Sequence, residues 1–313
     1  MAIAAFQHNG TVTKVKGTRC RFLAMMPVSD GFRSDLRPAM QKNVLLATLL
    51  CLGGAAQTAA SEQIEIPTDD KPLQAVIFRP EGAGPFAAIV ALHGCDGLRR
   101  NNGQMRKPLN DWGQLLSAAG FVVLFPDSYG SRGLAHQCSI KTPVIRPDKE
   151  RVADTRAARD WLQQQNFIRK DRVSLLGWAN GGITALWTVR PSLEPDDDRP
   201  DFRSAAVFYP GCRRLGDTAW SSRVPTLILI GALDNWTPAK HCEDMVRNAR
   251  GRSAQAVIVK YKGAHHAFDL ENVPVTQRAK VAFTPDPGGR VTIGTNSEAR
   301  ADALKRVQQW LSR

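Results

Sequence analysis

The residues with the clearest chemical potential are Gly177–Gly181, with the sequence GWANG, because they have the frame of the G-x-S-x-G turn with Ala179 at the position of the serine. In that pattern, a sharp strand-to-helix turn presents a nucleophilic hydroxyl, and the flanking glycines leave room for the turn. The chemistry would be attack on a carbonyl carbon to form an acyl intermediate. Ala179 has no hydroxyl, so the case for such a site depends on the other groups that acyl transfer requires.

An acid and a base follow the turn in the order nucleophile, acid, histidine that such sites have. Asp234 comes after the expected strand Thr226–Ile230, where a carboxylate could orient an imidazole. An aspartate in a loop often caps a turn instead, but its place at a strand end favours the catalytic role. His266 follows the expected strand Ala256–Tyr261 and is the candidate base, and we expect the adjacent His265 to have a supporting or surface role.

Acyl transfer also requires hydrogen-bond donors for the oxyanion. The backbone N–H of Asn180 follows the nucleophile position, and the N–H of Cys95 follows an early strand, so these two groups are the expected oxyanion hole. Both donors belong to the backbone, and alanine at the turn therefore leaves them unaffected. We interpret His93 as packed beneath this loop, and His136 and His241 as structural or loop histidines.

The elements that must position these residues follow from the alternation of apolar, β-rich runs with segments of helical period from residue 73 onward. This alternation predicts the α/β class, with a mostly parallel central sheet, helices on both faces and a single domain. Strands are expected at Leu73–Arg79, Phe86–Leu92, Phe121–Phe125, Val173–Leu176, Ala205–Tyr209, Thr226–Ile230 and Ala256–Tyr261. Helices are expected at Asn110–Ala119, 149–165, Gly182–Val189, Ala239–Asn248 and Ser297–Ser312.

The N-terminal residues have the pattern of a targeting segment. Lys42 precedes an apolar run over 44–52, and small residues continue to Ala60, which is the order of a secretory signal. We therefore predict a signal peptide at 40–60, an exported (periplasmic or secreted) domain at 61–313 and no stable membrane span after cleavage; a membrane anchor is the alternative. Residues 1–39 are expected to be an over-extended reading frame or a disordered basic leader.

The formal net charge of +13 in 313 residues decreases when the basic leader is removed. The remaining Lys and Arg residues are scattered, without a basic stripe that alternates with exposed aromatics, which argues against nucleic-acid binding. No C-x-x-C or other zinc motif is present, and we expect no metal or other cofactor. The expected partner is a small molecule.

Four cysteines lie in the predicted domain: Cys95, Cys138, Cys212 and Cys242. An even number in an exported protein permits disulfides, and four cysteines allow three pairings. We favour Cys95–Cys138 with Cys212–Cys242, because each pair would join loops at the same end of a parallel sheet. Free buried thiols are the alternative.

Taken together, the motifs resemble those of the dienelactone hydrolase family, particularly its exported branch. The resemblance extends over residues 62–313 and implies an α/β-hydrolase fold and hydrolysis of lactones or other carboxylic esters by a Ser or Cys nucleophile with Asp and His. Carried over, it makes Asp234 the acid and His266 the base, and the chain departs from the family pattern at Ala179. The matching segments are Leu92–Leu98, Pro126–Gly133, Gly177–Gly182, Tyr209–Cys212, Asp234, and Tyr261–Phe268 followed by Asp269.

The alanine leaves three explanations open. The first is an engineered exchange that disables a hydrolase, and the second is a natural non-catalytic protein that binds a ligand on the same scaffold. The third is a changed mechanism in which His266 and Asp234 activate water directly, which is chemically feasible but slow without covalent help. In each case Ala179 prevents formation of an acyl intermediate at the turn.

Overall fold

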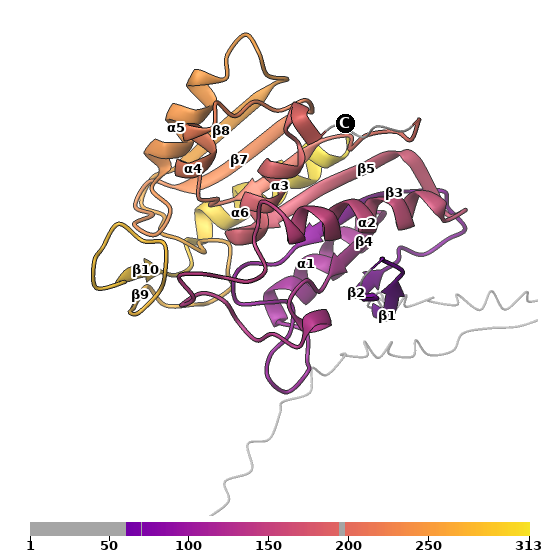
Figure 1. Cartoon of the computed structure of the whole chain (residues 1–313), viewed down its shortest axis with the longest axis horizontal. Helices are drawn as coiled ribbons and strands as arrows, with labels where there is room; N and C mark the ends of the chain where they lie inside the picture. Colours follow the sequence, from indigo (N-terminus) through magenta and orange to yellow (C-terminus); the bar gives the residue numbers. More distant parts are fainter. Residues whose placement is uncertain (1–60, 70, 194–197) are drawn as a thin grey trace, which may run out of the picture. The chain divides into compact units, whose positions relative to one another are not determined.

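The computed structural model describes residues 61–69, 71–193 and 198–313 (Figure 1). These residues form one α/β domain with a mostly parallel sheet and helices on both faces, as the sequence predicts. The expected leader and signal peptide lie outside the described residues. None of the described helices is long and apolar enough to cross a lipid bilayer.

The central sheet has eight strands in the order β1-β2-β4-β3-β5-β6-β7-β8. Strands β1 and β2 pair antiparallel, β2 is antiparallel to β4, and the strands from β4 through β8 are parallel. The strands are β1 (Ser61–Ile66), β2 (Leu73–Phe78), β3 (Phe86–Leu92), β4 (Phe121–Pro126), β5 (Ile168–Trp178), β6 (Ala205–Phe208), β7 (Thr226–Gly231) and β8 (Ala256–Tyr261). A separate antiparallel pair consists of β9 (Thr276–Arg278) and β10 (Val291–Ile293).

In the described part of the chain, six α-helices accompany the sheet, and Figure 1 shows α2 and α3 side by side along its middle strands. Helix α1 contacts β2 and β4, α5 contacts β7 and β8, and α6 contacts β6. The helices are α1 (Lys107–Ala118), α2 (Glu150–Gln164), α3 (Asn180–Thr188), α4 (Arg213–Asp217), α5 (Ala239–Asn248) and α6 (Ser297–Leu311). Two short 3₁₀ helices lie at Gly130–Arg132 and Pro191–Leu193.

The middle of the sheet is buried on both faces, which explains why its strands are continuous apolar runs. All six residues of β7 are buried, as are Ile89, Val123 and Leu175 in the neighbouring strands. Parallel strands all end at one edge, so the loops after β3, β5, β7 and β8 can meet there. These are the loops that contain the candidate residues.

The structure extends several of the expected elements. Strand β5 begins at Ile168 rather than Val173, and α1 begins at Lys107 rather than Asn110. Strand β1, helix α4 and the pair β9–β10 are not among the elements expected from the sequence. β1 is mostly exposed and polar, and the others are only three to five residues long, so none gives a clear apolar pattern.

Candidate active site

The turn at Ala179 joins the end of β5 directly to the beginning of α3. Ala179 has φ 47° and ψ −109°, a conformation that non-glycine residues rarely adopt and that costs about 1–3 kcal/mol. Its N–H donates to the carbonyl of Phe208 at 3.0 Å, and its carbonyl accepts from Ile183 at 2.9 Å. The structure thus has the strained strand-turn-helix geometry that the GWANG pattern predicts.

Gly177 and Gly181 are required by close backbone contacts. A Cβ atom on Gly177 would lie 2.5 Å from the carbonyl oxygen of Gly181. A Cβ atom on Gly181 would lie 2.0 Å from the carbonyl oxygen of Leu92 in β3. These distances exclude any side chain, so both glycines allow the turn to pack against the sheet.

Asp234 and His266 are brought together by the loops after β7 and β8. The His266 Nδ1 atom lies 2.8 Å from Asp234 Oδ2, and both residues are almost fully buried. Asp234 Oδ1 accepts the backbone N–H groups of Trp236 and Thr237 at 2.9 and 2.8 Å. The carboxylate is therefore fixed from two sides, and its bond to Nδ1 assigns the proton to that nitrogen and leaves Nε2 as the basic atom.

Three neighbours hold the His266 ring in place. The Thr237 hydroxyl lies 3.2 Å from Nδ1, 3.0 Å from Asp234 Oδ2 and 3.1 Å from the carbonyl oxygen of Tyr209. The rings of Tyr209 and Trp236 pack on the imidazole with centroid distances of 4.4 and 4.7 Å. This packing restricts the imidazole to one orientation.

The two expected oxyanion donors also lie at the turn. Asn180 is the first residue of α3, where backbone N–H groups have no partner within the helix. Cys95 follows Gly94, and a Cβ atom on Gly94 would be 3.8 Å from the Cβ of Ala179. The loop after β3 and the turn after β5 are thus adjacent, as an oxyanion hole requires.

A cavity of about 530 Å³ connects these groups. Ala179, Asn180, Cys95 and His266 line it, so four of the five predicted site residues share one surface, and Asp234 lies behind His266. The other walls come mainly from segments 137–148, 236–238 and 282–285 and from helices α3 and α4, with His241 from α5. Apolar side chains in these walls include Ile183, Trp187, Trp236 and Phe283, and cationic ones include Lys141 and Arg213.

Arg151 on α2 is a buried residue that the sequence analysis did not select. Its guanidinium donates to the Asn180 side-chain oxygen and, at 2.8 Å, to the carbonyl of His93. It also lies over the ring of Tyr129, whose hydroxyl is 3.3 Å from the same Asn180 oxygen. Arg151 therefore ties the loop after β3 to the beginning of α3, which are the two segments that supply the oxyanion donors. A helical arginine gives no sequence signal for this role, because arginines usually lie on the exposed face.

Asp269 is a second buried polar residue, and the sequence analysis had identified it only as part of a matching segment. Its carboxyl accepts hydrogen bonds from Tyr209 Oη at 2.6 Å, Trp178 Nε1 at 2.9 Å and Trp112 Nε1 at 3.1 Å. Burial raises the pKa of this carboxyl. Asp269 thus supports Trp178, which precedes Ala179, and Tyr209, which packs on His266.

The other histidines have different positions. His93 is fully buried with Nδ1 2.8 Å from the carbonyl oxygen of Gly94, which confirms its structural interpretation. Burial, followed by the charge of Arg151, lowers the pKa of His93 well below its ordinary value of 6.5. His136 is exposed, whereas His241 is on α5 and lines the cavity, which the sequence analysis did not foresee. Within the described residues, no group of three His, Cys, Asp or Glu could hold a metal ion.

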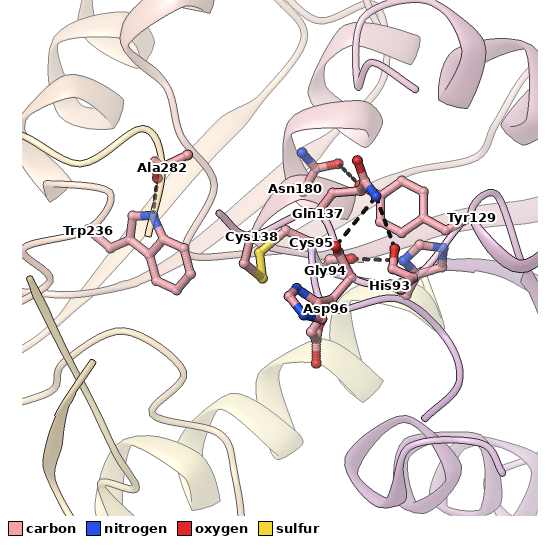
Figure 2. Close-up of a disulfide and its surroundings, with 12 residues drawn as sticks. His93, Gly94, Cys95, Asp96, Tyr129, Gln137, Cys138, Asn180, Trp236 and Ala282 are labelled. Atoms are coloured by element: carbon pink, nitrogen blue, oxygen red, sulfur yellow. Dashed lines mark hydrogen bonds between the residues drawn. A yellow bond between two sulfur atoms is a disulfide. The ribbon is translucent and has the colours of Figure 1, made fainter. Parts of the chain in front are cut away.

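Both preferred disulfides are present in the structure. Cys95 pairs with Cys138 and Cys212 pairs with Cys242, which confirms this pairing among the three that four cysteines allow. Figure 2 shows the first disulfide beside Gly94 and Asn180, within the region of the expected oxyanion hole.

Comparisons with known proteins give the family of this chain. The model of the dienelactone hydrolase family matches residues 73–313. A Bradyrhizobium protein described as a "Probable 2-oxo-3-(5-oxofuran-2-ylidene)propanoate lactonase" is 25% identical over 228 residues, which are 68% of this chain and 86% of the relative.

Two solved structures share the fold at lower identity. A dienelactone hydrolase-like promiscuous phosphotriesterase from metagenomic libraries has a TM-score of 0.63 and 16% identity, and the match covers 82% of this chain and 98% of that one. Esterase 2 of Thermogutta terrifontis, phosphorylated by paraoxon, has a TM-score of 0.57 and 18% identity, with coverage of 82% and 94%. With the family model matching most of the sequence and the fold agreeing, this chain belongs to the dienelactone hydrolase family.

Proposed function

We propose that the chain binds a carboxylic ester or lactone in the cavity, with the substrate carbonyl oxygen at the N–H groups of Cys95 and Asn180. The proposal makes His266 the base and Asp234 the group that orients it. Ala179 is the nucleophile position of a hydrolase whose turnover is abolished or very low in this chain. The family relation and the lactonase name of the Bradyrhizobium relative support the substrate class.

The observation that carries this proposal is the common cavity of Ala179, Asn180, Cys95 and His266, with Asp234 bound to His266 Nδ1. A serine hydroxyl at position 179 could deliver its proton to His266 Nε2 as it attacked the carbonyl carbon. The developing oxyanion would then receive the two backbone N–H groups. Every part of this sequence except the hydroxyl has a candidate group in the chain.

Without the hydroxyl, no bond can form between the substrate carbonyl and residue 179. In a serine hydrolase, loss of the nucleophile lowers turnover on the order of a million-fold, which corresponds to about 8 kcal/mol in the barrier. The oxyanion donors and the cavity still favour binding of the substrate. A non-catalytic ligand-binding protein is therefore the second candidate, and it is favoured by a strained turn and a cavity that remain formed without the hydroxyl.

The deciding experiment compares the chain with its Ala179→Ser variant on short aryl esters and lactones. We expect kcat to rise by at least about 1,000-fold, because the serine would gain a base and an oxyanion hole that are already in position. A large and equal rate in both forms would instead support direct activation of water by His266. Absence of turnover in both, together with ester binding measured by calorimetry, would support the binding protein.

We also propose that the mature protein is exported. Disulfides persist in oxidising compartments and are rare in the cytosol of mesophiles. The two disulfides of the described residues and the sequence pattern at 40–60 support this proposal. Mass spectrometry of the mature N-terminus, expected at Ser61, tests it.

A further inference from the structure

We propose that the Cys95–Cys138 disulfide is a positioning element of the active site, which holds the oxyanion donor of Cys95 at a fixed place relative to Asp234 and His266. This inference rests on the proposed function. Membership of the family does not by itself assign a role to this disulfide. The inference is drawn from a continuous series of bonds that runs around the cavity from Cys95 to Asp234 and His266.

The first part of the series lies at the oxyanion hole. The disulfide joins Cys95, in the loop after β3, to Cys138, in the long segment that precedes α2. The backbone N–H of Gln137 donates to the carbonyl of Cys95 at 2.6 Å, next to the disulfide (Figure 2). Cys95 is thus held by a covalent bond and a short hydrogen bond to two successive residues of the same segment.

The second part continues to the acid and the histidine. The carbonyl of Cys138 accepts the N–H of Ala282 at 2.8 Å, and the carbonyl of Ala282 accepts Trp236 Nε1 at 3.0 Å, a bond that Figure 2 shows. The backbone N–H of Trp236 donates to Asp234 Oδ1 at 2.9 Å. The Trp236 ring packs on His266, so the series ends on both members of the acid–histidine pair.

The segment that carries Cys138 has few other attachments. Residues 135–145 contain no helix or strand. Among the described residues, their backbone hydrogen bonds to other segments are those with Cys95 and Ala282. Without the disulfide, these two hydrogen bonds and the burial of Ile145 would have to hold residues 135–145 in place. A loop so weakly attached is expected to move and release Ala282 and Trp236.

The other disulfide offers a matched control. Cys212 and Cys242 are buried and join the N-terminus of α4 to α5. This bridge closes a similar length of chain, with a sequence separation of 30 against 43, so its removal should cost similar stability through the unfolded state. Cys212 lines the cavity, but this bridge bonds to neither the oxyanion donors nor the acid, so its loss should leave the geometry of those groups intact.

The test uses two double variants of the full chain, each in the Ala179→Ser background: Cys95→Ser with Cys138→Ser, and Cys212→Ser with Cys242→Ser. Turnover of 4-nitrophenyl acetate is measured, because this ester is too small to depend on the far wall of the cavity. We expect the first pair to lower kcat by about 10- to 100-fold, since loss of one oxyanion donor typically lowers kcat by about 100- to 1,000-fold and a displaced donor less. The control pair should retain kcat within about threefold, although the Tm of both variants falls.

Equal kcat in the two double variants would overturn the inference, whatever their Tm values. If Ala179→Ser alone has no turnover, the proposed function fails, and amide hydrogen exchange in the chain with Ala179 then decides the inference separately. Loss of the Cys95–Cys138 bridge should accelerate exchange at Trp236 and Thr237, whose N–H groups bind Asp234, and loss of the control bridge should not. Unchanged exchange at both positions would refute the positioning role.

Discussion

The two sides of the cavity differ in completeness. On one side, Asp234 and His266 are bound to each other and to Thr237, and two aromatic rings enclose the imidazole. On the other side, the turn keeps its strained backbone and lies next to the loop of Cys95, but Ala179 ends at Cβ. The Asp234–His266 side therefore has the polar contacts that the proposed acid and base require, and the turn on the other side lacks the hydroxyl oxygen of a serine.

This difference shows which parts of such a site depend on the fold. The carboxylate of Asp234 is buried and needs its donors, because an unpaired buried charge is strongly unfavourable. The missing hydroxyl would only have faced the cavity, so its absence leaves no buried group without a partner. Packing of Gly177 and Gly181 maintains the turn, with no contribution from the side chain at 179.

The largest effect is expected from a substitution in the Asp234–His266 pair. Asp234→Asn in the Ala179→Ser background should lower kcat by about 10,000-fold, because an amide no longer selects the Nδ1–H tautomer of His266. The same substitution in the chain with Ala179 should leave the residual rate of ester hydrolysis unchanged. Steady-state kinetics of the chain with Ala179, of Ala179→Ser and of Asp234→Asn in each of these two backgrounds measures both changes in rate. A matching loss in the chain with Ala179 would mean that His266 already activates water there.

A smaller effect is expected from Arg151→Met, which alters the incomplete side. The substitution removes the charged donor from Asn180 Oδ1, which keeps the Tyr129 hydroxyl at 3.3 Å, and removes a donor from the buried His93 carbonyl. A buried acceptor left unpaired costs about 1–3 kcal/mol in the free energy of unfolding. In the Ala179→Ser background, kcat should also fall by about tenfold, because both oxyanion segments lose their common tie. Urea denaturation and steady-state kinetics measure the two effects. Arg169→Met, at an exposed position, is the control and should change neither.

The buried His93 should make the loop after β3 sensitive to acid. Its pKa is lowered in the folded state, so the unfolded chain binds its proton first as the pH falls through 6.5. The contribution of neutral His93 to the free energy of unfolding should therefore be retained above pH 6.5 and lost as the pH falls below it. We expect a decrease on the order of 1–2 kcal/mol between pH 7 and pH 5. His93→Gln should reduce this slope of unfolding free energy against pH, whereas His136→Gln, at an exposed position, should not. Identical slopes in all three proteins would contradict this role for His93.

The smallest effect should come from relaxing the turn. Ala179→Gly removes the Cβ that makes φ 47° unfavourable, and we expect the free energy of unfolding to increase by about 1 kcal/mol after the entropy cost of glycine. Ala153→Gly, at an exposed position within α2, should decrease it by about 1 kcal/mol. Thermal unfolding of both variants provides the comparison. An equal decrease in both would show that the turn at Ala179 stores no strain.

By itself, the sequence determined the α/β class, the turn at Ala179 and the pairing of Asp234 with His266. Each of these is encoded locally, by an apolar run that ends in a loop or by glycines at fixed spacing. Parallel strands bring such loop residues to one edge, and this rule also led to both disulfides. The starts of β5 and α1 were less well predicted, because packing against neighbours extends an element beyond its periodic segment.

Only the tertiary structure decided which remote residues complete the site. Arg151 and Asp269 become important because burial brings them against groups 29 and 60 or more positions away in the chain, and no local pattern marks that burial. The same holds for His241 and for the series of bonds from Cys138 through Ala282 to Trp236, which joins segments without periodicity. Local patterns specify which residues end a strand, whereas contacts between distant loops depend on how the whole domain packs.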